Sequence, residues 1–110
     1  MFIINEDKSI EITRGDTAYI TVSIPDYKFK INDIIKFGVK KRASDEEFLF
    51  LKTIEITEEA EAAVVKISPE DTKEANFGSY VYDVEFIDGI TKDVNTIITI
   101  NSFVILKEVS

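Results

Sequence analysis

Carboxylates are the side chains of this sequence whose spacing comes closest to being chemically useful. Asp83 and Glu85 lie two positions apart in an alternating run, so a strand would place both on one face. Two carboxylates held on one face could divide the roles of acid and base between them. A polar sheet surface is the other interpretation, and we favour it because no nearby residue indicates a pocket or a perturbed pKa.

Two acidic clusters offer a second kind of chemistry, the binding of a hard cation such as calcium. They consist of Asp45, Glu46 and Glu47, and of Glu58, Glu59 and Glu61. Calcium loops space their ligands at alternate positions around a glycine, and neither cluster does so. The sequence therefore favours a solvated acidic rim over a metal site, and we expect no cofactor.

Arg14-Gly15-Asp16 matches the tripeptide that integrins recognise in exposed loops. A match of three residues often arises by chance, and Gly-Asp is common in turns. We therefore predict a β-turn between two strands at this position, and not a recognition loop.

Composition limits the remaining chemistry. The 110 residues include no cysteine and no histidine, which excludes disulfides and thiolate sites and removes the commonest general base. The 13 basic and 21 acidic residues give a formal net charge of −8, which repels nucleic-acid backbones and anionic lipid surfaces. No apolar run approaches the roughly 20 residues that a membrane-spanning helix needs, and no signal peptide is recognisable. We therefore expect a non-enzymatic protein that binds neither nucleic acid nor membrane.

The positions of the strands follow from the alternation of apolar and polar residues. The clearest run covers residues 17–24, in which Ala18, Ile20, Val22 and Ile24 would face the core. Residues 48–51 are apolar on both faces, which fits either a strand covered on both sides or a short buried strand that leads into a bend. Further strands are predicted at 10–13, 34–41, 63–67, 79–87, 91–100 and 103–106, with a break at Asn101-Ser102 between the last two.

Turn signals concentrate before and after one tyrosine-rich strand. Ser68 can cap a short helical turn near residues 69–76, whose first position is a proline that needs no N–H partner. Gly78 would end that turn. At the far end of the strand, Asp88-Gly89 predicts a two-residue type I′ hairpin turn, because both residues tolerate a positive φ.

Together these elements predict one all-β domain over residues 1–110. Seven to eight short strands with regularly spaced turn signals and a single helical turn are typical of an antiparallel β-sandwich. Tyr80, which follows Gly78, resembles the tyrosine at the E-to-F corner of immunoglobulin-like domains, where the hydroxyl bonds back across the corner. Tyr82 stands where disulfide-bonded domains of that class have a cysteine, so the resemblance implies an immunoglobulin-like architecture alone.

Short segments spread along most of the chain occur in a recognisable order: Ile12 to Thr17, Phe37 to Lys41, Ser68 to Thr72, Gly78 to Val84, Ser102-Phe103 and Glu108 to Ser110. In order and spacing they are similar to small β-sandwich proteins of phage and prophage structural clusters, which are associated with tail or baseplate assembly. The resemblance implies a structural role without catalytic residues and a location in the virion, or in the host cytoplasm before assembly. It also implies other protein subunits as partners, a homo-oligomer among them.

Two functions compete on this basis. The first is a structural or interaction module whose exposed apolar residues pair with other subunits. Candidate interface residues are Phe2, Ile3, Ile4, Phe48, Leu49, Phe50, Leu51, Phe103 and Val104. The second is an extracellular ligand-binding module, for a carbohydrate for example, with a concave aromatic site around Tyr19, Tyr27 and Phe29.

Overall fold

The structure is a computed structural model that describes residues 2–108. Strands and one short helix make up its regular structure, so the mostly β composition predicted from the sequence is confirmed. The elements are β1 (Phe2–Ile4), β2 (Ile10–Thr13), β3 (Ala18–Val22), β4 (Ile34–Lys40), β5 (Phe50–Glu55), β6 (Ala63–Ile67), α1 (Pro69–Lys73), β7 (Gly78–Ile87) and β8 (Val94–Leu106). Val109 and Ser110, which close the phage-like pattern, lie outside the described residues.

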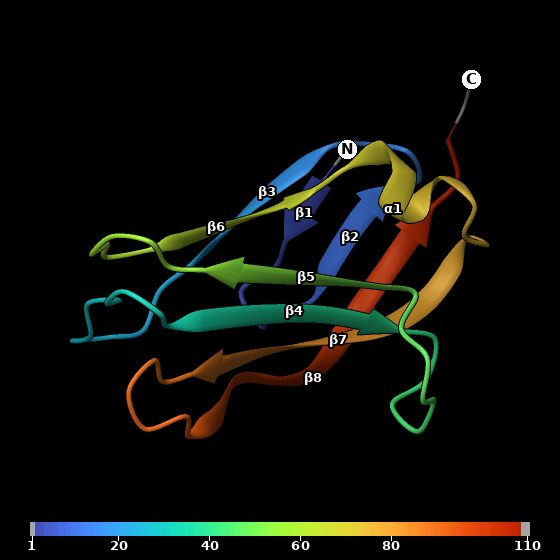
Figure 1. Ribbon diagram of the computed structural model, residues 1–110. Coiled ribbons are helices and arrows are strands. Elements are labelled where there is room, and N and C mark those ends of the chain that lie inside the picture. Colours follow the sequence, from blue (N-terminus) through green and yellow to red (C-terminus); the bar gives the residue numbers. More distant parts are fainter. Residues whose placement is uncertain (1, 109–110) are drawn as a thin grey trace.

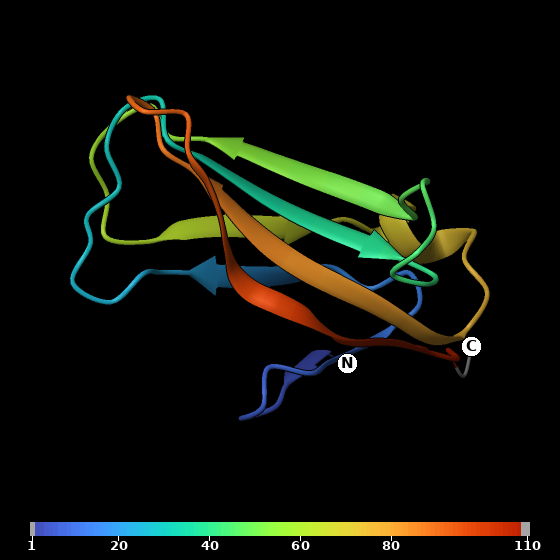
Figure 2. The same cartoon turned by 90° about the horizontal axis from the view of Figure 1, so that it is seen from below.

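Two sheets form the fold. Six strands pair in the order β1-β2-β8-β7-β4-β5, and β3 pairs with β6 in a separate antiparallel sheet. The larger sheet curls, and the small sheet runs along one side of it, as the perpendicular views in Figure 1 and Figure 2 show. Buried apolar side chains from both sheets form one core. We call the side of the larger sheet that faces away from β3 and β6 its outer face.

One strand pairing departs from the predicted antiparallel arrangement and makes the larger sheet mixed. β2 runs parallel to the last residues of β8, with Ile10 opposite Phe103 and Thr13 opposite Leu106. The chain between β2 and β8 passes through the small sheet before it returns, and such a crossover allows two strands to meet in parallel. Alternation identifies the buried face of each strand but carries no information on the direction of its neighbour.

Aromatic rings occupy the centre of the core. Phe37 of β4 stacks on Tyr82 of β7 with 5.1 Å between ring centroids. Phe103 of β8 approaches Phe37, Phe50 and Tyr82 edge-on, at 5.9 to 6.3 Å. Of the positions predicted to face inward in residues 17–24, Ala18, Ile20 and Val22 are buried in β3, and Ile24 is half-buried beyond the end of that strand. β4 and β7 also bury alternate positions, because these rings and their aliphatic neighbours lie on one face of each strand.

β8 is continuous through Asn101 and Ser102, so the predicted break there is wrong. Asn101 lies opposite Tyr82 in the ladder with β7. The Asn101 side chain accepts a hydrogen bond from the Ser102 N–H and donates one to the Asp7 carbonyl. Polar residues that favour turns can thus be satisfied inside a strand. The irregularity appears instead as two register shifts opposite residues 82–85, which β8 absorbs as bulges.

α1 is shorter than the predicted helical turn. Ser68 is its N-cap residue, and the Ser68 N–H donates to the Asp71 carboxylate at 2.7 Å. The helix ends at Lys73, whereas Gly78 opens β7 with a φ of 134°, a conformation that favours glycine. The prediction that Gly78 stops the helix is therefore wrong, because residues 74–77 separate the two.

The connection between β7 and β8 is longer than the two-residue type I′ turn predicted at Asp88-Gly89, and that prediction is wrong. The Asp88 N–H donates to the Asp93 carbonyl at 3.0 Å, and the positive φ, 65°, falls on Lys92. Gly89 is needed for a different reason, since a Cβ there would lie 2.6 Å from the carbonyl carbon of Asn32. The glycine therefore lets two loops meet backbone to backbone.

We predict that Gly89→Ala lowers the free energy of unfolding by about 1–3 kcal/mol, because the added methyl overlaps main-chain atoms that cannot rotate away. Urea unfolding followed by circular dichroism measures the change. Ile90→Ala is the matched control, since its side chain is 75% exposed in the same loop and its loss should change stability by less than about 0.5 kcal/mol. Equally small effects of both substitutions would contradict the close approach.

Candidate functional site

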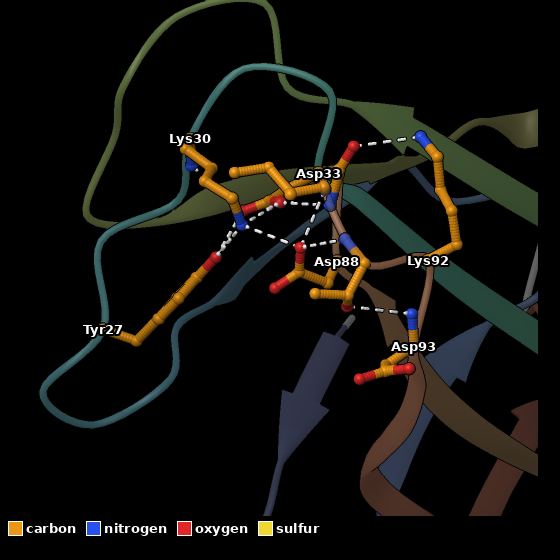
Figure 3. A network of polar contacts seen from close by, with 9 residues as sticks. Tyr27, Lys30, Asp33, Asp88, Lys92 and Asp93 are labelled. Atoms are coloured by element: carbon orange, nitrogen blue, oxygen red, sulfur yellow. Dashed lines mark hydrogen bonds and ion pairs between the residues drawn. The ribbon is translucent and has the colours of Figure 1, made fainter.

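The most extensively bonded polar group is the fully buried carboxylate of Asp33, shown in Figure 3. Asp33 directly precedes β4. Tyr27 and Lys30 come from the connection between β3 and β4, and Asp88 and Gly89 come from the connection between β7 and β8. We call these five residues the Asp33 cluster. They bring together two loops that are far apart in the sequence.

Both oxygens of Asp33 are fully hydrogen-bonded. Oδ2 accepts from the Tyr27 hydroxyl at 2.7 Å and from the Lys30 N–H at 3.0 Å. Oδ1 accepts from the Lys30 ammonium at 2.9 Å and from the Gly89 N–H at 2.7 Å. The Lys30 Nζ also donates to the Tyr27 hydroxyl and lies 3.2 Å from Asp88 Oδ1. Four donors, one of which is the Lys30 ammonium cation, offset the cost of burying this charge.

The cluster holds fixed protonation states. Burial raises the pKa of Asp33, but hydrogen bonds from the Lys30 N–H, the Tyr27 hydroxyl and the Lys30 ammonium outweigh it and lower the pKa to about 2. The pKa of Lys30 is raised, first by its bond with the Tyr27 hydroxyl and then by Asp33. Burial, followed by the bond to Asp33, raises the pKa of Tyr27. Groups that keep their charge and already have partners suit a structural link better than proton transfer.

Backbone bonds attach a third segment to the same end of the fold. The Asn32 N–H donates to the Ile56 carbonyl at 2.9 Å, and the Ile56 N–H donates to the Asp33 carbonyl at 2.8 Å. Phe29 and Ala60 form an isolated antiparallel bridge. The Asp33 cluster thus lies where three connections between strands converge.

The sequence patterns did not indicate this cluster and pointed to Tyr27 only as part of a possible carbohydrate site. The only signal in the sequence is the three-residue spacing of Tyr27, Lys30 and Asp33. Their partner Gly89 lies 56 positions beyond Asp33, a pairing that no local pattern reveals.

The Arg14-Gly15-Asp16 tripeptide forms the predicted turn. The Asp16 N–H donates to the Thr13 carbonyl at 3.1 Å, and Gly15 has a φ of 83°. Arg14 binds Glu108 through two hydrogen bonds, with Nη2 at 2.5 Å from Oε1 and Nε at 3.1 Å from Oε2. The guanidinium is therefore committed to contacts within the chain.

Two tyrosine hydroxyls attach β7 to preceding segments. The Tyr80 hydroxyl donates to the Asn76 carbonyl, four positions earlier in the chain, at 2.7 Å. The Tyr82 hydroxyl donates to the Lys8 carbonyl. Burial, followed by the charge of Asp7, raises the pKa of Tyr82 to about 12.

The predicted interface residues are not brought together on one surface. Phe50 and Phe103 are buried in the aromatic core, so their prediction as surface contacts is wrong; each ring lies on the inner face of its strand. The exposed members are Ile3, Ile4, Phe48 and Leu51, and the half-buried ones are Phe2, Leu49 and Val104. β1 and β5, which carry exposed residues of this set, are opposite edges of the larger sheet.

A shallow groove of about 230 Å³ lies on the outer face. Its lining includes Gly38, Phe48, Asp83, Glu85 and Ile100. The Phe48 ring covers Gly38 so closely that a Cβ there would lie 2.6 Å from the ring. Asp83 and Glu85 therefore share one sheet face, as predicted, beside an apolar ring rather than in an enclosed pocket.

The three aromatic residues proposed for a carbohydrate site do not line one concavity. Phe29 is fully buried, and Tyr27 is half-buried with its hydroxyl in the Asp33 cluster. Tyr19 is 61% exposed on β3, where the Lys66 ammonium lies 5.9 Å from its ring centroid. No stacking platform is formed by this set.

Among residues 2–108, no three acidic side chains gather in a geometry that could hold a metal ion. No helix in the same range has the length and apolar character to cross a bilayer. No protein-family model, curated protein or solved structure matches the chain.

We predict that Asp33→Asn lowers the free energy of unfolding at pH 7 by about 2–3 kcal/mol, because the carboxylate accepts charge-assisted bonds that an amide cannot replace. The wild-type protein should also lose about 2 kcal/mol as the pH falls from about 4 to 2. The pKa of Asp33 in the folded protein, about 2, lies below the ordinary value of 3.8. The stabilisation is therefore complete at pH values above 3.8 and is lost as the pH falls towards 2.

Urea midpoints measured between pH 2 and 7 separate this contribution from general acid destabilisation. Asp26→Asn is the matched control, because Asp26 is exposed in the same connection. The Asp26 variant should retain the wild-type pH profile. The Asp33 variant should not show the additional loss of stability that the wild type shows between about pH 4 and 2. Identical profiles for all three proteins would show that Asp33 does not govern acid stability.

Proposed function

We propose that this chain is a non-enzymatic protein-interaction module, and that it serves the tail or baseplate of a phage-type particle. The uncovered outer face of the larger sheet carries the proposal. Leu51 is 43% exposed and Ile100 60% exposed on this face, and the Phe48 ring lies between their strands over Gly38. Contiguous apolar side chains on an exposed face favour a protein partner. The sequence resemblance to phage structural proteins supplies the type of assembly.

We also assign the two sheets to an immunoglobulin-like β-sandwich. In that class, strands C, F and G share one sheet, and strands B and E belong to the other. The same division separates β4, β7 and β8 from β3 and β6, and β5 beside β4 matches the added strand of variable-type domains. The bond from Tyr80 to Asn76 falls at the corner between the strands that correspond to E and F.

If this corner holds the fold together, Tyr80→Phe should lower the free energy of unfolding by about 0.5–1.5 kcal/mol through loss of one hydroxyl bond. Thermal and urea unfolding both report the change. Tyr19→Phe removes the hydroxyl of an exposed tyrosine and should leave stability unaltered. A Tyr80 variant as stable as the Tyr19 control would remove the corner from this assignment.

The function is tested by particle association. In cells that produce both the chain and its particle, tagged wild-type protein should sediment with the particle fraction. Leu51→Asp should abolish this association, because it places a charge at an exposed apolar position beside the Phe48 ring. Val64→Asp makes the same kind of change at a 52% exposed position of β6, outside the outer face, and should have no effect. Sedimentation of the wild type as a free protein would contradict the proposal.

A further inference from the structure

The central charges of the outer face balance one another. β4 places Lys36 and Lys40 on this face, and β7 places Asp83 and Glu85 there. The chain as a whole has a net charge of −8, so two copies repel over most of their surface. This central patch, with two charges of each sign, is a place where a second copy can approach without that repulsion.

Three of these charges, Lys36, Asp83 and Glu85, are also available to a partner, whereas the Lys40 ammonium lies 4.7 Å from the centroid of the Phe48 ring. Lys36 and Glu85 lie opposite each other in the ladder of β4 and β7. No ion pair among residues 2–108 uses Lys36, Lys40, Asp83 or Glu85. The side chains are half-buried, so they have lost part of their contact with solvent before a partner approaches.

The apolar residues of the face flank the charges at one height along the strands. Gly38 lies opposite Leu51 on one side and opposite Asp83 on the other. Ile100 of β8 lines the same groove as Gly38 and Asp83. One row across the outer face therefore has an exposed apolar side chain at each end, and the neighbouring row has Lys36 and Glu85 at its centre.

From this arrangement we infer that the outer face binds the outer face of a second copy of this chain, about a two-fold axis that runs parallel to the strands between β4 and β7. This inference rests on the proposed function, since it names the partner of the same face. Rotation about that axis lays β4 of each copy over β7 of the other at the same height. Lys36 then meets Glu85 of the second copy, and Leu51 meets Ile100 of the second copy.

The dimensions of the molecule fit such a dimer. The chain measures 45 × 27 × 25 Å along its principal axes. A stable interface of standard size buries about 800 Å² on each partner, which a sheet face within these dimensions can supply. In the dimer, two symmetric ion pairs lie between two apolar contacts. The outer face is therefore complementary to a second copy of itself in both charge and hydrophobicity.

A charge exchange tests this geometry. Sedimentation equilibrium of the purified chain should give a mass near twice 12.5 kDa. Lys36→Glu and Glu85→Lys each create two like-charge contacts across the axis and should raise the dimer dissociation constant about 100-fold. The double variant restores opposite charges and should return the dissociation constant to within about tenfold of the wild type.

Lys66→Glu is the matched control, because Lys66 is an exposed lysine of β6 outside the outer face. This variant should remain dimeric. Circular dichroism must show that each variant is folded before its mass is interpreted. If a single charge variant unfolds, Leu51→Asp replaces it and should likewise yield a monomer. A monomeric wild type at several hundred micromolar, or a dimer that Lys36→Glu and Leu51→Asp leave intact, would overturn the inference.

The outcomes for the two proposals are distinguishable. A monomeric wild type whose particle association still depends on Leu51 would refute the dimer and leave the proposed function standing. A dimer that obeys the charge exchange but never sediments with particles would refute the proposed function and support the self-association of the outer face.

Discussion

The buried carboxylate of Asp33 is the constraint on which this end of the structure depends. An ionised group without solvent costs several kcal/mol unless donors surround it, and the donors here come from both of the loops that meet at Asp33. Gly89 donates its main-chain N–H to Asp33, and because it has no Cβ the two loops can touch at this point. The start of β4 and the end of β7 are thereby fixed against each other, and the register of the central ladder follows from that contact.

The opposite end of the sheet is fixed by different chemistry. There the Tyr80 hydroxyl binds the Asn76 carbonyl, and Arg14 binds both Glu108 and the Ala75 carbonyl. Each of these bonds attaches a strand to the segment that follows α1 or to the end of the chain. Polar bonds at the two ends and an aromatic core on the inner side thus carry the stability of the sheet. On the outer face, Lys36, Asp83 and Glu85 take part in no ion pair among residues 2–108, and Leu51 and Ile100 are exposed, which is the basis of the binding proposed for this face.

Local chemistry made much of the fold predictable. The alternation in β3, β4 and β7 identified their buried faces, because a strand with one side against a core must alternate. The start of α1 followed from Ser68 and the proline after it. Asn101 and Asp88-Gly89 were misinterpreted because the same residues serve turns and strands, and long-range contacts decided between the two. The Asn101 side chain accepts a hydrogen bond from the next residue within β8. Gly89 is required because main-chain atoms of Asn32 leave no room for a Cβ.

For the candidate site, the sequence by itself determined the inventory: no histidine or cysteine, an excess of acidic groups, and apolar runs whose exposure it could not assign. Only the tertiary structure decided that Phe50 and Phe103 are core, that Leu51 and Ile100 are surface, and that Asp33 meets Gly89. It also decided that β2 runs parallel to β8. The physical reason is that periodicity reports which side of a strand is buried, whereas neighbours and register depend on contacts between residues far apart in the chain.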